Sequence, residues 1–208
     1  MIESIDVEAA LPPERMVPKA ECVGDGRINP RGIPCLYLAT TAGAAISEMR
    51  PWVGEYITLA QFKTVSDCLV VDCSLSTMQS DWLEPVNLNG PNGKREPDAR
   101  EKEDGVWGDI GFAFSKPVTV DERQLDYVPT QILAETFRNE GYHGIVYKSL
   151  LDEAGKNIAL FNLASATLII RCLYRIRSVA LESAKLESVP SSWPESILSE
   201  LRPSRKIF

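Results

Sequence analysis

Residues 26–51, GRINPRGIPCLYLATTAGAAISEMRP, place a turn, a short apolar run and a helix rich in small residues in close succession. The turn is rich in Gly and Pro, which favour tight turns. The run CLYLA at 35–39 is short and apolar with one aromatic residue, which is typical of a buried strand. Thr40 or Thr41 can then cap a helix that ends near Met49, just before a proline.

Three polar side chains stand out in this segment, because each sits in a different predicted element: Arg27 in the turn, Tyr37 in the strand and Glu48 on the helix. Taken singly, each has an ordinary explanation, as a solvated turn residue, a core ring with its hydroxyl at the edge, or an exposed glutamate. Helical spacing predicts an apolar face made by Ala42, Ala45, Ile46 and Met49. Glu48 lies off the centre of that face, so spacing alone gives it no special role.

The rest of the chain alternates between predicted strands and helices. Apolar, β-branched and aromatic runs predict strands, of which the last is bent or split, at 55–62, 68–74, 144–148, 157–161 and within 166–183. A helix is predicted from Pro129, with Gly141 as its C-terminal stop. Its positions with helical spacing are Ile132, Leu133, Thr136 and Phe137. This alternation predicts a mixed α/β or α+β domain.

The length of 208 residues suits a single domain over residues 1–208, with a motif-bearing core at about 20–178. Residues 79–109 are rich in charge, Pro, Gly and Asn, so we predict a long loop there, either a functional lid or plain disorder. An irregular lead-in is expected over 1–19. A C-terminal tail is expected at about 184–208, with a short helix at 194–201.

Composition excludes some classes of function. The formal net charge is -7, so the chain offers no broad basic face and direct nucleic-acid binding is not expected, although a local basic pocket for a small anion stays open. The N-terminus has no basic and apolar pattern of a signal peptide. No run approaches the ~18 apolar residues of a membrane span. We therefore expect a cytoplasmic protein without a membrane partner.

Metal and common nucleotide motifs are also missing from the sequence. The five cysteines form no CxxC pair and His143 is the single histidine, so no metal site is expected. Buried free thiols in a reducing cytoplasm are expected at Cys22, Cys35, Cys68, Cys73 and Cys172. The sequence has no GxxxxGK[ST], HExxH or GxSxG motif and no GxGxxG after a strand. His143 is predicted to be a turn or half-buried imidazole.

Two longer blocks, taken together, resemble the signature of the RES domain family, which is named for its Arg, Glu and Ser. The first block, GRINPRGIPCLYLATTAGAAISE, matches a G-R-x-N-x-x-G turn, an L-Y-L-A strand and a helix ending in A-x-x-E. The second, DYVPTQILAETFRNEGYHGIVYKS followed by NIALF, matches Y-x-x-T-Q, G-x-x-G-I-x-Y-x-S and N-x-x-L-F. The match spans roughly residues 20–165.

The resemblance implies an α+β fold like the catalytic core of ADP-ribosyltransferases, with a split, strongly bent β-sheet and flanking helices around an NAD⁺ cleft. It implies that Arg27, Tyr37, Glu48 and Ser149 form the active site. Arg31, four residues after Arg27, is a second cation that either contacts phosphate or is simply solvated. RES domains are known as NAD⁺-degrading enzymes, and many are toxins held inactive by an Xre-family antitoxin. We therefore expect an enzyme that cleaves NAD⁺ between nicotinamide and ribose, with phosphate or water as acceptor and no further cofactor. The family also allows a homodimer.

The expected reaction suits these side chains. Nicotinamide leaves as a neutral group, so no general acid is required, and Glu48 can stabilise an oxocarbenium-like transition state. Arg27 can hold the pyrophosphate with its planar fork, and Tyr37 can stack on nicotinamide or ribose. Ser149 can bind a ribose hydroxyl or orient Glu48. Two alternatives stay open: an ADP-ribosyltransferase that modifies a macromolecule, and a non-catalytic nucleotide-binding or interaction module.

Overall fold

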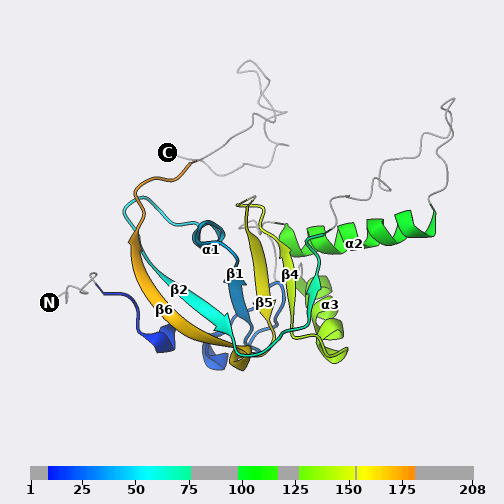
Figure 1. Cartoon of the computed structure of the whole chain (residues 1–208), viewed down its shortest axis with the longest axis horizontal. Helices are drawn as coiled ribbons and strands as arrows, with labels where there is room; N and C mark the ends of the chain where they lie inside the picture. Colours follow the sequence, from blue (N-terminus) through cyan, green and yellow to red (C-terminus); the bar gives the residue numbers. More distant parts are fainter. Residues whose placement is uncertain (1–8, 76–97, 117–126, 153, 181–208) are drawn as a thin grey trace, which may run out of the picture. The chain divides into compact units, whose positions relative to one another are not determined.

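The computed structural model describes residues 9–75, 98–116, 127–152 and 154–180. The chain divides into two compact units, residues 1–177 and 178–208, and the fold lies in the first. Within its described part, this unit contains one four-stranded sheet, one two-stranded sheet and three α-helices (Figure 1). The predicted α+β class, with its sheet split in two, is therefore confirmed. The division into one domain and a tail stays a prediction.

The four-stranded sheet is built from the short apolar runs of the sequence. Its strand order is β1 (Leu36–Ala39), β5 (Lys156–Leu160), β4 (Gly144–Lys148) and β3 (Val70–Asp72). β5 is antiparallel to both β1 and β4, whereas β3 and β4 run parallel. The predicted strands in these four places are confirmed. The sheet brings the ends of β1, β4 and β5, where the matched motifs lie, next to one another.

The second sheet pairs β2 (Tyr56–Thr64) with β6 (Ala166–Arg175) in antiparallel fashion. The register shifts between Gln61 and Phe62, as in a β-bulge, and both strands curve in Figure 1. The strand predicted within 166–183 thus ends at Arg175. Short 3₁₀ turns complete the described elements, at Pro13–Arg15, Ala20–Cys22 and Leu163–Ser165.

Helix α1 (Ala42–Glu48) begins as predicted, because the Thr41 hydroxyl accepts a hydrogen bond from Ala44 N at 3.0 Å. The helix contacts β1, β2 and β5. Its predicted apolar face is wrong: the buried residue is Ala44, and Met49 is 70% exposed. The reason is close packing, since a Cβ on Gly155 would lie 2.5 Å from the Ala44 Cβ. Glu48, one turn after Ala44, lies on the same side of the helix but is exposed.

Helix α2 (Ala99–Ser115) corrects the prediction of a loop over 79–109, because residues 99–109 are helical. Residues 79–97 lie outside the described residues. A capping box starts the helix: the Asp98 side chain accepts from Glu101 N, and the Glu101 side chain accepts from Asp98 N, both at 2.9 Å. Its buried face has three-residue spacing and consists of Gly105, Gly108, Gly111 and Phe114. Gly105 and Gly108, which fall within the predicted loop, thus belong to the packing face of a helix.

Helix α3 (Val128–Asn139) has Pro129 in its first turn and is followed by Gly141, whose φ is +88°. The predicted helix and stop are therefore confirmed. Its inward face differs in part from the predicted one. Thr130 and Ala134 are buried, whereas Ile132 is exposed.

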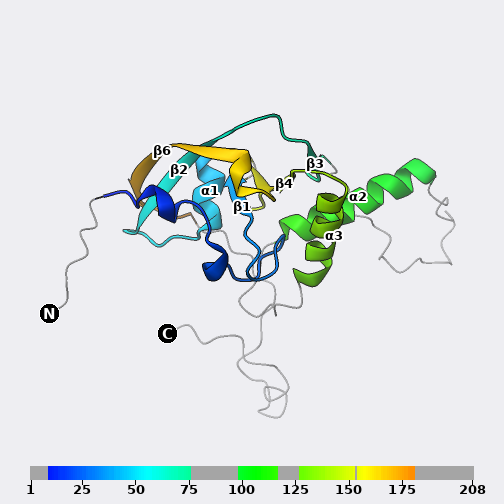
Figure 2. The same cartoon turned by 90° about the horizontal axis from the view of Figure 1, so that it is seen from below.

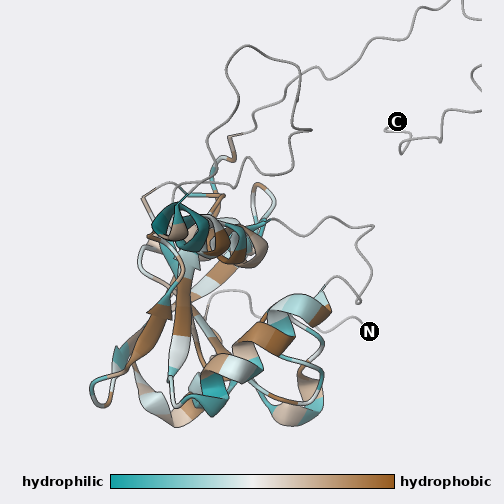
Figure 3. Ribbon diagram, turned by 90° about the vertical axis from the view of Figure 1, so that its right-hand side faces the viewer, coloured by the Kyte–Doolittle hydropathy of each residue, from teal (hydrophilic) through white to brown (hydrophobic). Residues whose placement is uncertain are grey.

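The core lies between α2, α3 and the strands of the larger sheet. Helices α2 and α3 both contact β4, and α1 lies beside β1 and β2 in two views (Figures 1 and 2). The end of α2 that faces the viewer in Figure 3 is hydrophilic, while apolar segments gather on the strands. The core cluster consists of Ile28, Cys35, Val71, Cys73, Phe114, Ala134, Ile145, Tyr147 and Ala159.

The cysteines and the histidine are ordinary parts of this scaffold. All five cysteines are free, but only Cys35 and Cys73 are buried, so the expectation of buried thiols is wrong for the other three. His143 lies in the turn before β4, as predicted. Its Nδ1 accepts a hydrogen bond from Leu69 N at 2.9 Å, which extends the pairing of β3 with β4.

Candidate active site

A cavity of about 480 Å³ lies where α1, α2, β1, β4 and β5 meet the turn at residues 26–29. The three predicted residues Arg27, Tyr37 and Glu48 all line it. Ser149 reaches the same place through a hydrogen bond to Glu48. The complete lining is Gly26, Arg27, Tyr37, Glu48, Arg50, Phe114, Ser115, Lys116, Tyr127, Tyr147, Leu150, Leu151 and Asn157.

Glu48 is held by two neutral donors from the larger sheet. Asn157 Nδ2 donates to Glu48 Oε1 at 2.7 Å, and Ser149 Oγ donates to the same oxygen at 3.2 Å. Ser149 Oγ also accepts from Leu151 N at 3.3 Å, which leaves its proton for Glu48. Both bonds found within the described residues end on Oε1. Within the described part of the chain, Oε2 accepts no hydrogen bond and no cation forms an ion pair with the carboxylate.

Tyr37 is fixed by its hydroxyl and presents its ring. The hydroxyl donates to Asn29 Oδ1 at 2.7 Å and accepts from Ile28 N at 3.2 Å. Tyr37 as a whole is 45% exposed, so the exposed surface belongs to the ring while the hydroxyl end is enclosed. Burial of that end raises the pKa of Tyr37 above its ordinary value, so the phenol is neutral at physiological pH.

The glycine before Arg27 is required by this arrangement. A Cβ on Gly26 would lie 2.6 Å from Asn29 Oδ1 and 2.8 Å from the Tyr37 hydroxyl oxygen. Any side chain there would therefore break the bond that orients Tyr37. Asn29 also ties the turn together, because its Nδ2 donates to the carbonyls of Gly24 and Pro30, each at 3.1 Å. The N of the G-R-x-N pattern thus has a positioning role that the sequence did not assign.

Arg27 connects the turn to the end of α2. Its two terminal nitrogens donate to the carbonyl oxygens of Ala113 and Lys116, in the last turn of that helix. A guanidinium at this place satisfies unpaired carbonyls and complements the negative end of the helix dipole. Helix α3 also binds this turn, because Thr130 Oγ1 donates a hydrogen bond to the Arg27 carbonyl at 2.7 Å.

Gln131 is the second residue of α3 that hydrogen-bonds to this turn. Its Nε2 donates to the Gly26 carbonyl at 2.9 Å and to the Asn29 carbonyl at 3.1 Å. The T-Q pair of the Y-x-x-T-Q pattern therefore acts on the backbone around Arg27. The pattern itself was the signal for these two residues, but the sequence alone could not show what they contact.

Arg31 is not brought to the cavity. Its side chain is 73% exposed, and Nε lies 3.8 Å from Asp25 Oδ2. A second arginine, Arg50, lines the cavity instead, together with Lys116 from the end of α2. Sequence reasoning missed both, because neither lies in a matched pattern.

Tyr147 is a further lining residue that the sequence did not single out as a site residue. It is 8% exposed, and its ring lies 6.2 Å from that of Phe114, measured between centroids. Burial raises the pKa of Tyr147, the nearby Glu48 charge raises it further and Arg27 opposes both. The hydroxyl is therefore neutral at physiological pH and can donate a hydrogen bond.

The lining combines positive charge with aromatic rings. Three cations, Arg27, Arg50 and Lys116, surround one acid, Glu48, in a chain whose formal net charge is -7. The rings come from Tyr37, Phe114, Tyr127 and Tyr147. Such a cavity suits an anionic ligand that also carries flat rings.

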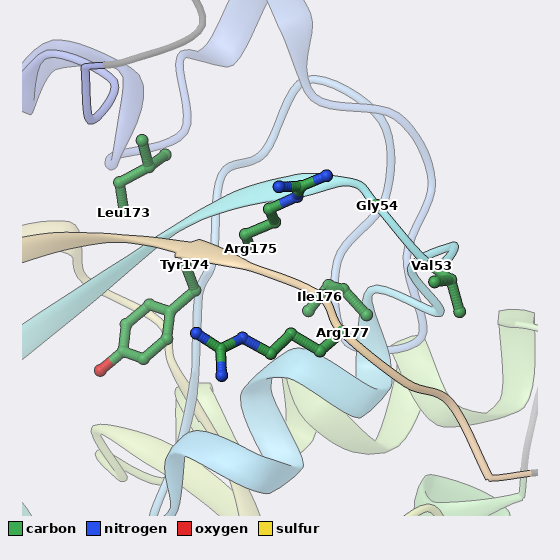
Figure 4. A pocket seen from close by; sticks show the side chains of 7 residues that line it. All are labelled: Val53, Gly54, Leu173, Tyr174, Arg175, Ile176 and Arg177. Atoms are coloured by element: carbon green, nitrogen blue, oxygen red, sulfur yellow. The ribbon is translucent and has the colours of Figure 1, made fainter.

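A second cavity, of about 600 Å³, lies at the end of the β2–β6 sheet (Figure 4). It is lined by Val53, Gly54 and residues 173–177, with Tyr174 and Arg177 on one side of the strand and Arg175 on the other. Its lining contains no carboxylate and no predicted site residue. The larger volume therefore does not make it the reactive site.

The described residues were also considered as possible metal ligands and membrane spans, with the following result for each. No group of three or more His, Cys, Asp or Glu there could hold a metal ion. None of the helices in the described part has the length and apolar character needed to cross a bilayer.

Comparison with known proteins agrees with the geometry of the site. No curated protein and no solved structure matches the chain. The model of the RES domain family matches residues 12–177, a range that includes every residue lining the smaller cavity. The chain therefore belongs to the RES domain family.

Proposed function

We propose that this protein cleaves the nicotinamide–ribose bond of NAD⁺. RES domains are known for NAD⁺-related enzyme activity, so membership supports the substrate class. The observation that carries the specific reaction is Glu48, a carboxylate fixed at one oxygen by Ser149 and Asn157 and open at the other, in a cavity that holds three cations. A sugar that develops positive charge next to Glu48 and a pyrophosphate next to the cations would match this distribution.

The reaction needs electrostatic stabilisation more than proton transfer. As the bond from the ribose carbon to the pyridinium nitrogen breaks, its electron pair returns to the ring and nicotinamide leaves uncharged. The ribose becomes oxocarbenium-like, and Glu48 stabilises that charge. An oxygen of phosphate or water then forms the new bond to the same carbon. When water is the acceptor, Glu48 Oε2 would polarise it, and the proton that water loses passes to solvent.

The remaining residues would bind and orient the dinucleotide. The exposed ring of Tyr37 offers a surface for stacking, and its anchored hydroxyl keeps the ring in one orientation. Arg27 spends one hydrogen of each terminal nitrogen on α2, which leaves further N–H groups for phosphate oxygens. Ser149 orients Glu48 in preference to binding ribose, because its hydroxyl proton is directed to Oε1.

Mass spectrometry of NAD⁺ incubated with the protein, with and without phosphate, tests this proposal. We expect the wild type to release nicotinamide, and Glu48→Ala to be slower by ~10²–10³, the usual loss for one such electrostatic group. Arg31→Ala is the matched control, because Arg31 lies outside the cavity and should leave turnover unchanged. The second product, ADP-ribose or its phosphorylated form, names the acceptor.

The same samples separate the other candidate functions. A label that moves from NAD⁺ to a protein or nucleic acid would identify an ADP-ribosyltransferase. Intact NAD⁺ that nevertheless binds would identify a non-catalytic module. Either result would contradict the proposed cleavage reaction.

We further propose that the enzyme is a toxin whose partner is an Xre-family antitoxin. RES domains are generally paired with antitoxins, and this family membership supports the pairing. Expression of the wild type should arrest growth of a bacterial host, and expression of Glu48→Ala should not. Equal growth of both strains at equal protein levels would contradict the toxin role.

A further inference from the structure

Arg50 combines an unfavourable backbone conformation with a place in the cavity wall. Among the described residues other than glycine, it alone has a positive φ, of +47°. It follows the C-cap residue of α1, and its N–H donates to the Ser47 carbonyl at 3.0 Å. It also lines the cavity, two positions after Glu48.

The end of helix α1 explains why residue 50 has a left-handed conformation, but it does not explain why this residue is an arginine. A helix commonly ends with one residue in the left-handed region, and that residue is usually Gly or Asn, because a side chain with a Cβ is strained there. The following residue is Pro51, which restricts its predecessor to extended conformations. A glycine at position 50 would therefore meet the same backbone demand with less strain. The sequence keeps a long cationic side chain instead.

What the arginine adds is a positive charge at the cavity. It lines the cavity together with two other cations, Arg27 and Lys116, whereas Arg31 lies beside Asp25, outside the cavity. Strained residues that persist at a ligand site are commonly retained because their side chain serves the ligand.

We propose that Arg50 is a substrate-contacting residue that binds the diphosphate of a nucleotide in this cavity, and that its strained backbone is retained for this contact. The assignment rests on the proposed function for its substrate class, a nucleoside diphosphate. A guanidinium suits this class because its planar fork can donate to two phosphate oxygens at once. Arg50 thus takes the place that the sequence predicted for Arg31.

The test compares nucleotide affinity with thermal stability in the full chain, using ADP as the probe and isothermal titration for Kd. Arg50→Gly should weaken ADP binding by about 10–100-fold, the loss of a charge-assisted contact. Its melting temperature should not fall, and relief of strain should raise it by up to about 2–4 °C. Arg50→Lys should keep most of the affinity, and Arg31→Ala should match the wild type in both measurements.

If Arg50 served stability alone, Arg50→Gly would lower the melting temperature and leave ADP binding unchanged. The proposal is overturned if Arg50→Gly binds ADP as tightly as the wild type, if its melting temperature drops, or if the wild type does not bind ADP. If Arg50→Gly does not fold, Arg50→Asn, which also tolerates this conformation, is expected to fold, to lose affinity and to keep its melting temperature. Loss of ADP binding in a protein that leaves NAD⁺ intact would support the role of Arg50 and contradict only the cleavage reaction.

Discussion

Asn157 shows how one neutral side chain can orient the carboxylate that we propose to be catalytic. It is buried in β5, and its amide donates the shorter of the two hydrogen bonds to Glu48 Oε1, at 2.7 Å. A lysine or arginine in its place would hold the carboxylate equally well but would cancel its charge. The amide therefore orients Glu48 and leaves it able to stabilise a cation.

Replacement of Asn157 by alanine should lower kcat by about 10–100-fold, because the loss of a hydrogen bond to a charged group costs ~1.5–3 kcal/mol. KM should change little, since Asn157 acts through Glu48. The matched control is Asn162→Ala, which removes a cap bond to Ala164 N outside the cavity. Steady-state kinetics measure both variants.

A double variant decides whether Asn157 acts through the carboxylate. In a Glu48→Ala background, the further change Asn157→Ala should have almost no effect, because residues that act as a unit are not additive. If the second change lowers the residual rate by the same factor as in the wild type, Asn157 has another role.

At the scale of elements, α2 approaches the larger sheet through a glycine. A Cβ on Gly111 would lie 2.4 Å from the Cys73 carbonyl oxygen, at the end of β3. The last turn of the same helix supplies Phe114, Ser115 and Lys116 to the cavity and accepts the hydrogen bonds of Arg27. The depth at which α2 packs therefore sets one wall of the site.

Gly111→Ala should destabilise the protein by about 1–3 kcal/mol through overpacking, despite the higher helix propensity of alanine. The fall in melting temperature should be about 2–4 °C for each kcal/mol. Gly24→Ala is the control, because a Cβ at Gly24 has nothing within 4 Å. Thermal unfolding of both variants checks the prediction. An unchanged or higher melting temperature for Gly111→Ala would contradict close packing at this point.

Strands were the elements that the sequence predicted best, because a short apolar run leaves few alternatives to a buried strand. Helices were harder where function or close packing replaces apolar residues. On α1 the buried residue is Ala44, and Glu48 follows it by one turn, so apolar spacing did not identify the side of the helix that carries Glu48. On α2 three of the four buried residues are glycines, and glycine in a sequence usually indicates a turn or loop.

The site was predicted correctly only where its residues lie in the family motifs. Resemblance to the family indicated Arg27, Tyr37, Glu48 and Ser149, and the structure brings these four together, while their roles stay predictions. Arg31, proposed from its position four residues after Arg27, lies elsewhere. Arg50 could not be predicted, because its significance depends on a backbone angle and on the position of the cavity.

Across the whole molecule, the cysteines divide by burial. Burial raises the pKa of Cys35 to about 11 and that of Cys73 to about 12, from an ordinary value of 9.0. The thiolate is the reactive form, so these two thiols are protected both by the fold and by protonation. Cys22 and Cys172 are exposed and are not shielded by the fold.

A thiol reagent at pH 8 should therefore modify Cys22 and Cys172 first, and Cys35 and Cys73 only after unfolding in urea. Because the pKa values of Cys35 and Cys73 are raised in the folded state, their contribution to stability is complete below about pH 9 and is lost as the pH rises through 11 to 12. Peptide mapping gives the order of labelling. Early modification of Cys35 or Cys73 in the native protein would contradict this assignment of burial.

The two donors that hold Glu48 also have a consequence for the order of events during translation. The ribosome makes the reactive glutamate early, but Ser149 comes 101 residues later and Asn157 109 residues later. Strand β5, which carries Asn157, must emerge before the carboxylate can be oriented. A nascent or prematurely terminated chain would hold the glutamate without its supports. If the finished enzyme consumes a nucleotide that its own host needs, this order keeps it idle until β5 has been made.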